Sequence, residues 1–169
     1  MRLALVVMAP PAAIAEAICE RTCELAGGLA HVQSAELASR HVHADGRVVS
    51  VQRWRAKASV PALLRPHLEE SLLDWTLTFE RLPGALDCRW HAQSAARQLP
   101  HRCRGTMQFL PAIGGRATRI DLRCEFAAAN EGLRTIFGRL LAEHWRSIAE
   151  AAARRLAPVA VDRPSLPAA

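Results

Sequence analysis

The sequence predicts a single α+β domain in which a curved antiparallel sheet of about seven strands wraps around a long C-terminal helix. Two observations favour this class. Several segments between residues 31 and 126 alternate apolar and polar side chains, as strands with one covered face do. Residues 133–156 then repeat apolar side chains at helical spacing. Strands and helices do not alternate along the chain, which disfavours a parallel sheet.

The chain has 169 residues, enough for one domain with a sizeable core and too few for two. We assign residues 1–157 to the domain and residues 158–169, which contain three prolines and no periodic pattern, to a loose tail. No apolar stretch approaches the roughly 20 residues of a transmembrane helix. The sequence therefore predicts a soluble protein without integral membrane association.

A formal charge of +6 and a pI near 9.9 raise the question of a nucleic-acid partner. The positive residues are spread along the chain, however, and Arg102 and Arg104 alternate with Cys103 and Gly105 as on the solvated face of a strand. Neither interleaved aromatic residues nor a common nucleic-acid-binding motif accompanies them. We therefore expect no nucleic-acid partner.

The first residues allow two interpretations. Residues 2–8, followed by small residues at 13–15, resemble a short signal peptide. The apolar run is short and Pro10 and Pro11 interrupt it, so a first strand followed by a helix that begins at the prolines fits equally well. Five cysteines, an odd number without the spacing of a disulfide framework, favour reduced thiols and a cytoplasmic location.

Residues 10–25 have a helical pattern, which predicts one kinked helix or two short ones ending before Gly27. Asp45 and Gly46 supply the positive φ of a hairpin turn. A turn is also expected at residues 111–115. Alternation and turn residues predict six strands, at residues 31–43, 47–57, 75–80, 86–94, 102–110 and 119–126.

The last two of these strands have the strongest alternation. Their predicted inward side chains are Cys103, Gly105, Met107 and Phe109 on one strand and Ile120, Leu122, Cys124 and Phe126 on the next. The intervening positions are mostly charged. One apolar and one polar face is typical of an antiparallel sheet that is covered on one side only.

The final helix is expected to begin at Asn130, an N-cap residue followed by the acidic Glu131. Its predicted buried stripe comprises Leu133, Phe137, Leu140, Leu141, His144, Trp145, Ile148 and Ala152. At 1.5 Å per residue, a helix of about 25 residues is about 38 Å long and crosses a whole small domain. The sheet is the element large enough to cover that stripe.

Three local segments, together with the order of elements, carry a resemblance to a known superfamily. They are Ala9-Pro10-Pro11-Ala12, Gly105 to Pro111 before Gly114-Gly115, and Leu141 to Trp145. Over residues 1 to about 157 the chain resembles the START-like (SRPBCC) superfamily, which includes plant Bet v 1 proteins and bacterial polyketide cyclases. Residues 60–66 are similar to the corresponding segment of a bacterial branch. The resemblance implies the helix-grip fold, with a ligand cavity between the sheet and the last helix.

Members of that superfamily bind lipids, sterols, quinones or polyketides, and some catalyse cyclisation or dehydration. The resemblance therefore implies binding or carriage of a small hydrophobic ligand such as a lipid, isoprenoid or polyketide-like compound, with binding favoured over catalysis. A polyketide cyclase or dehydratase, with a cavity histidine or arginine as acid or base, is the alternative. A ligand-free interaction module is a further one.

Aromatic and apolar residues on the predicted inner surface are the candidate ligand-binding residues, although ordinary core packing explains each of them as well. They are Trp54, Trp75, Phe79, Trp90, Met107, Phe109, Leu141, His144 and Trp145. His144 is the expected polar member, and the direction of Arg53 and Arg55 is left open. No catalytic set can be assembled from the linear motifs. Neither a catalytic residue nor a cofactor is expected.

Four other features have an ordinary structural explanation beside a functional one. His41 and His43 share a strand face but lack a third ligand, so no metal site is expected. Cys19 and Cys23 lie one helical turn apart and are expected to be buried thiols. Gly138 provides either close contact between helix and sheet or room for a ligand. Residues 61–73, bracketed by prolines, form either a lid or an insertion at the sheet edge.

Overall fold

The computed structural model describes residues 1–57, 74–94, 102–126 and 131–157. All strands in these ranges belong to one antiparallel sheet in the order β1-β7-β6-β5-β4-β3-β2. Their bounds are β1 Arg2–Val7, β2 Val32–Val42, β3 Val48–Ala56, β4 Asp74–Arg81, β5 Asp87–Ser94, β6 Arg102–Ala112 and β7 Ala117–Phe126. The predicted seven-stranded sheet is confirmed. Residues 61–73, expected to form a lid or an insertion at the sheet edge, lie outside the described residues, as do the tail and the N-cap Asn130.

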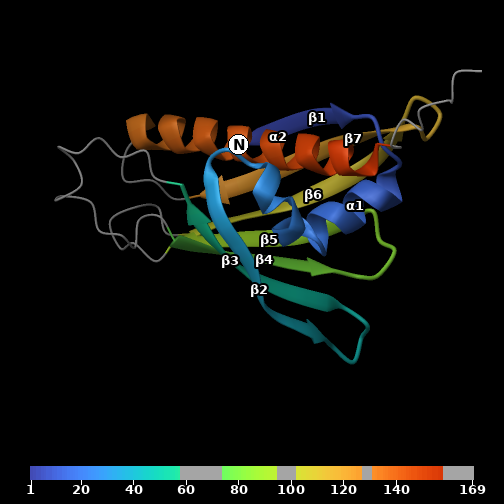
Figure 1. Ribbon diagram of the computed structural model, residues 1–169, viewed down its shortest axis with the longest axis horizontal. Helices are drawn as coiled ribbons and strands as arrows, with labels where there is room; N and C mark the ends of the chain where they lie inside the picture. Colours follow the sequence, from blue (N-terminus) through green and yellow to red (C-terminus); the bar gives the residue numbers. More distant parts are fainter. Residues whose placement is uncertain (58–73, 95–101, 127–130, 158–169) are drawn as a thin grey trace, which may run out of the picture.

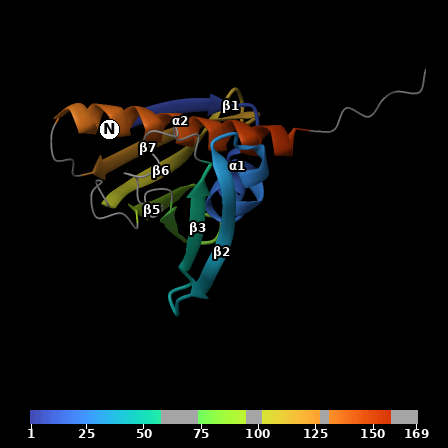
Figure 2. The same ribbon diagram turned by 60° about the vertical axis from the view of Figure 1, so that its left-hand side comes forward.

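Helix α2, Glu131–Leu156, lies across one face of the sheet, and α1, Pro11–Cys19, lies beside its C-terminal half (Figures 1 and 2). A 3₁₀-helix, η1 (Thr22–Gly28), follows α1. The segment at 10–25 is thus divided in two, one of the two forms expected. Pro11 opens α1 at a position whose N–H would have no helical partner in any case. The helix-grip arrangement is therefore present.

Residues 2–7 form a strand of this sheet. Strand β1 pairs antiparallel with β7, placing Leu3 opposite Leu122 and Leu5 opposite Ile120. These side chains all belong to the core between the sheet and α2. The strand interpretation of the first residues is confirmed.

The turn between β6 and β7 is shorter than predicted. Pro111 remains in the strand opposite Thr118, and the turn begins only at Ile113, where three consecutive residues have positive φ. Proline is accepted close to a strand end because its missing N–H removes little of the hydrogen-bond ladder there. The prediction that Pro111 begins the turn is wrong for this reason.

The buried stripe of α2 is confirmed in its C-terminal half. Trp145, Ile148 and Ala152 are at most 2% exposed, whereas Leu140 is 61% exposed. Leu140 precedes Trp145 by five residues, which is about 140° around a helix of 3.6 residues per turn. Its assignment to the buried stripe is wrong. Spacing of three or four residues was counted from neighbour to neighbour, and these steps together rotated Leu140 away from the buried side of the helix. The side chains of Leu133 and Phe137 lie outside the described ones.

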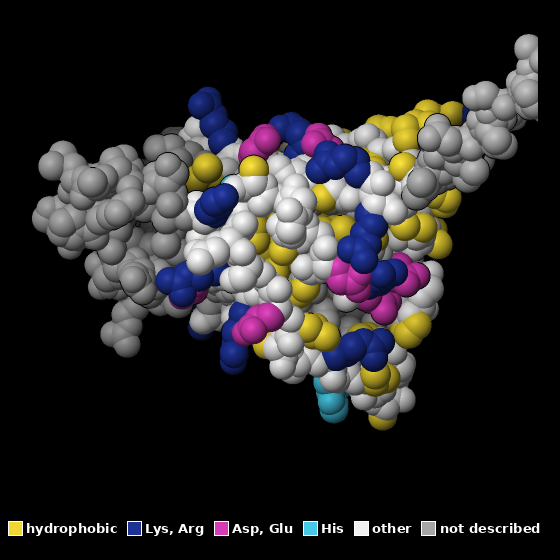
Figure 3. Space-filling view, viewed as in Figure 1, with side chains coloured by type: hydrophobic (Ala, Val, Ile, Leu, Met, Phe, Trp, Pro, Cys, Tyr) yellow, Lys and Arg dark blue, Asp and Glu magenta, His cyan; other side chains and the backbone are white. Residues whose placement is uncertain are grey.

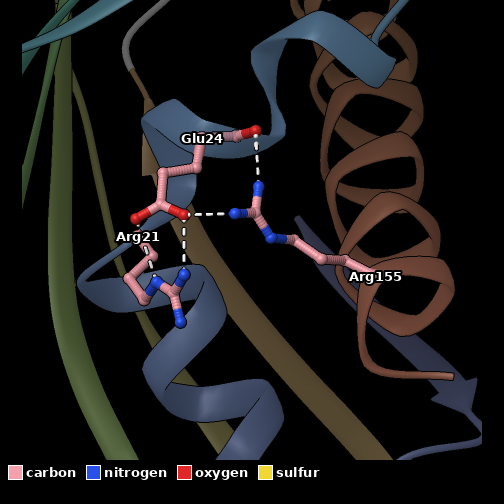
Figure 4. Close-up of polar contacts among 3 residues, drawn as sticks. All are labelled: Arg21, Glu24 and Arg155. Carbon is pink, nitrogen blue, oxygen red and sulfur yellow. Dashed lines mark hydrogen bonds and ion pairs between the residues drawn. The ribbon is translucent and has the colours of Figure 1, made fainter. Parts of the chain in front are cut away.

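A polar cluster fastens the last turn of α2 to η1 (Figure 4). Arg155 donates hydrogen bonds to the Glu24 carboxylate at 2.6 Å and to its backbone carbonyl at 3.1 Å. Arg21 donates two further hydrogen bonds to the same carboxylate. The arginines hold the pKa of Glu24 below its usual value. The C-terminal end of α2 is therefore attached to the helical layer as well as to the sheet.

Candidate functional site

The interior between α2 and the sheet is filled at the end where α1 lies, which we call the closed end. Helix α1 packs against α2, β6 and β7 there. Its core side chains are almost without exposed surface: Ile14, Ile18, Phe109, Ile120, Ile148 and Ala152. Close packing of this kind leaves little room for a ligand.

The opposite end of the same interior, which we call the open end, is different. Five apolar side chains that point inward there keep part of their surface exposed: Trp75, Ala92, Cys103, Phe126 and Leu141. They come from β4, β5, β6, β7 and the N-terminal half of α2, the half that is far from α1 in Figure 1. An apolar ligand could bind against the exposed parts of these inward side chains.

Aromatic rings separate the two ends. The rings of Trp90 and Trp145 are 4.9 Å apart, and Phe79 contacts Trp145 at 6.1 Å. Gly105 makes room for this wall, because a Cβ at position 105 would overlap the carbonyl oxygen of Arg123 and press on the Trp90 ring. These three aromatic side chains, Phe79, Trp90 and Trp145, form the inner boundary of the open end.

A histidine pair lies at the side of the open end. Nε2 of His31, just before β2, is 2.8 Å from Nδ1 of His144 on α2. The His144 ring also packs edge-on against Trp54 and Trp75, at 5.6 and 5.7 Å, and these two indoles are stacked. His144 is therefore held from both sides, by a hydrogen bond and by two aromatic rings.

Burial and, to a lesser extent, the neighbouring His31 lower the pKa of His144 to about 3. The residue as a whole retains some exposed surface, but its Nε2 atom is enclosed, so the ring itself is desolvated. Burial also lowers the pKa of the partly exposed His31, although Glu143 opposes that shift. Both imidazoles are accordingly neutral near pH 7.

Four enclosed nitrogen atoms of this interior lack a hydrogen-bond partner among the described residues. They are Nε2 of Gln52, Nε1 of Trp90, Nε2 of His144 and Nε1 of Trp145. Gln52 uses its Oε1 to accept a hydrogen bond from Trp54 Nε1 at 3.0 Å. Enclosed polar groups are nearly always paired, so a cluster of unpaired ones calls for a physical reason.

A hollow of about 650 Å³ opens between the N-terminal half of α2 and β7. Phe126 and Cys124 line it from the sheet, and Thr135, Gly138 and Ala142 from the helix. A Cβ at Gly138 would meet only the Phe126 ring, at an ordinary 3.7 Å. The close-contact explanation of this glycine is therefore wrong, because helix and sheet are too far apart here to exclude a methyl group. None of the nine candidate residues lines this hollow.

A larger hollow, about 1290 Å³, lies along β5, β6 and β7 and is lined by no described residue of α2. Its outward-pointing side chains include five arginines, at positions 2, 89, 102, 104 and 123. These arginines are distant in sequence but adjacent across the strands, with Arg2 directly opposite Arg123. The positive charge is thus less evenly spread in space than along the chain. On the face seen in Figure 3, by contrast, basic and acidic side chains lie side by side.

The structure brings the nine candidate residues into one continuous core. Trp54, Phe79, Trp90, Met107, Phe109 and Trp145 are at most 2% exposed. Trp75, Leu141 and His144 are partly exposed and lie at the open end. Whether any of the nine contacts a ligand stays a prediction. Arg53 and Arg55 both point away from the core, toward Glu36 and Asp74.

The sequence missed His31, which carries no recognisable pattern and lies 113 residues from its partner. Ala92 and Cys103 were not among the candidate residues, because alternation predicts which side chains point inward but says nothing of how tightly an inward position is covered.

The remaining candidates have ordinary roles. The rings of His41 and His43 contact each other at 4.8 Å, and no group of three possible metal ligands occurs among the described residues. All five cysteines are free; Cys19 is buried as expected, whereas Cys23 is only partly buried because it lies in η1, beyond the end of α1. Burial raises the pKa of Cys23 to about 11, which keeps that thiol protonated and unreactive. Within the described ranges, no helix has the length and apolarity needed to cross a membrane.

No family model and no curated protein matches this chain by sequence. Solved structures do resemble it. TTHA0849 from Thermus thermophilus has a TM-score of 0.64 at 22% identity, covering 92% of this chain and 95% of that one. Ara h 8.0201, a Bet v 1 allergen, has a TM-score of 0.66 at 12% identity with the same coverages.

The Zhui aromatase/cyclase from Streptomyces sp. R1128 has a TM-score of 0.62 at 12% identity and covers 92% of each chain. Identities this low establish the fold alone. Together with the seven-stranded sheet and its long helix, these similarities confirm the expected fold.

Proposed function

Starting from the Bet v 1-like (SRPBCC) helix-grip fold of this chain, we propose that the protein binds or carries a small hydrophobic molecule at the open end. The supporting observation is the contrast along one interior. Beside α1, side chains such as Ile14, Phe109 and Ile148 are fully covered, whereas the inward side chains of Trp75, Ala92, Cys103, Phe126 and Leu141 at the open end keep exposed surface. A lipid, isoprenoid or polyketide-like compound has the apolar surface that would cover them.

The walls of this end suit such a ligand. Trp75, Phe126 and Leu141 offer flat and branched apolar surface, and Gly138 leaves space next to Phe126. The enclosed unpaired polar atoms of the interior are neutral nitrogen atoms, while Arg2, Glu125 and Arg139 also line the hollow beside Phe126. The part of the ligand that enters the interior is therefore expected to be apolar and uncharged. Five free thiols support a reducing, cytoplasmic location for the carrier.

Native mass spectrometry of protein purified from cells tests this proposal. We expect a small-molecule adduct on the wild-type chain that is lost on unfolding. Gly138→Leu should fill the space beside Phe126 and remove the adduct, whereas the matched control Gly138→Ala adds one methyl group and should retain it. Wild-type protein without an adduct, together with a crystal structure whose open end is filled by its own side chains, would overturn the proposal.

A further inference from the structure

The histidine pair at the open end contains a polar atom that the binding of a purely apolar ligand would leave without a hydrogen bond. His144 Nδ1 is engaged by His31, but its Nε2 is enclosed and has no partner among the described residues. An enclosed polar atom without a partner destabilises the fold, because it loses its hydrogen bonds to water and gains none in return. A histidine packed edge-on against the stacked rings of Trp54 and Trp75, where an apolar residue would leave no unpaired nitrogen, indicates a partner that arrives with the ligand.

The direction of the hydrogen bond between His31 and His144 decides whether that partner must be a hydrogen-bond acceptor or a donor. One of the two neutral rings donates and the other accepts. If His31 Nε2–H donates, His144 carries its own proton on Nε2 and is a donor. If His144 Nδ1–H donates, its Nε2 is a bare acceptor. The first arrangement places both rings in the Nε2–H form, the commoner neutral tautomer of the histidine side chain.

The other unpartnered nitrogen atoms of the interior are hydrogen-bond donors, so they too require an acceptor. Nε1 of Trp90, Nε1 of Trp145 and Nε2 of Gln52 can only donate, and none has an acceptor within the described ranges. Ring contacts connect Trp90 to Trp145, Trp145 to His144 and His144 to Trp54, beside Gln52. The interior therefore has a surplus of donors, which an acceptor-bearing ligand relieves.

We infer that His31 and His144 form a polar anchor, in which His31 holds His144 as an Nε2–H donor that binds a neutral carbonyl oxygen of a flat, apolar ligand. This inference rests on the proposed function and specifies the ligand's polar group. His31 is a positioning residue, because its contact is with His144. Trp54 and Trp75 keep the His144 ring in place and dry, so its hydrogen bond is not weakened by competing water.

Two isosteric probes test the anchor. 2-Acetylnaphthalene carries a ketone where 2-isopropenylnaphthalene carries a methylene group of similar shape. Binding of each is measured by tryptophan fluorescence and calorimetry. We expect the wild-type protein to prefer the ketone about tenfold, the value of one buried hydrogen bond. His144→Phe keeps a flat ring and should abolish the preference, and His31→Phe should reduce it. His91→Phe, on the outer face of β5, is the control and should leave it unchanged.

Nitrogen-15 NMR of the wild-type histidines provides a measurement that needs no variant. It should show His144 protonated on Nε2 and bare on Nδ1, and addition of the ketone should shift the Nε2 signal. A proton on Nδ1 of His144 would overturn the inference. So would equal affinity of the wild-type chain for both probes, although the proposed function would then stand. If neither probe binds while native mass spectra still show an adduct, the anchor is again refuted and the carrier function is not.

Discussion

The two ends of the interior are built from the same elements but differ in how completely these are covered. At the closed end, α1 packs beside α2 and against β6 and β7, and Ile148 and Ala152 of α2 have no exposed surface. At the open end, no further helix among the described residues packs beside α2, and Leu141 remains partly exposed. A helix and a curved sheet alone therefore do not fill the volume between them. An incompletely packed end is tolerated because close packing at the other end stabilises the fold.

Truncation on the two halves of α2 gives the largest expected effect and tests this comparison directly. Ile148→Ala should lower the free energy of unfolding by about 3 kcal/mol, since it leaves a cavity in close packing. Leu141→Ala should cost about 1 kcal/mol, because its side chain is only partly covered. Urea unfolding measures both. Equal losses would mean that the open end is packed like the closed one.

Acid should weaken the fold through the histidine pair. The pKa of His144 is about 3 in the folded chain and about 6.5 when unfolded, so below pH 6.5 the unfolded state binds a proton that the folded state does not. Stability is therefore full above pH 6.5 and falls as the pH is lowered toward 3, by about 2 kcal/mol at pH 5. His31, whose pKa is also lowered, adds in the same direction.

Unfolding free energies measured in urea between pH 7 and 5 check this dependence. His144→Phe should show a shallower slope than wild type, because it removes the group whose pKa burial lowers. An unchanged slope in His144→Phe would show that its ring is already solvated in the folded chain.

A smaller effect, of opposite sign, is expected at Gly138. Gly138→Ala should raise the free energy of unfolding by about 1 kcal/mol, because alanine is the better helix former and its methyl group has room beside Phe126. Thermal unfolding followed by circular dichroism measures the change. A loss of stability would mean that helix and sheet approach more closely at the open end than described above.

The smallest effect is expected at the cluster that ties η1 to α2. Glu24→Gln removes the charge that Arg21 and Arg155 share, but all three side chains are exposed, so the melting temperature should hardly change. A large decrease would mean that this surface cluster, rather than the packing of α1, maintains the closed end.

Much of the fold could be predicted because strand and helix periods are local properties. The alternation in β6 and β7, the Asp45-Gly46 turn and the buried positions of Trp145 and Ile148 all follow from neighbours a few residues apart. Two local predictions were wrong: Leu140 was assigned to the buried stripe of α2, and Pro111 to the turn that follows β6. The candidate site could be predicted less well, since nine inward residues were indistinguishable until their coverage was known.

The sequence by itself determined which side of β6, β7 and α2 is apolar, and hence that the sheet and α2 face each other. Tertiary structure alone decided that α1 covers only half of that interface, and that His31 meets His144 across 113 residues. The physical reason is that apolar periodicity reports which surface leaves water, whereas contact between distant segments depends on how layers of finite size overlap. A ligand site is the part of the interface that those layers leave uncovered.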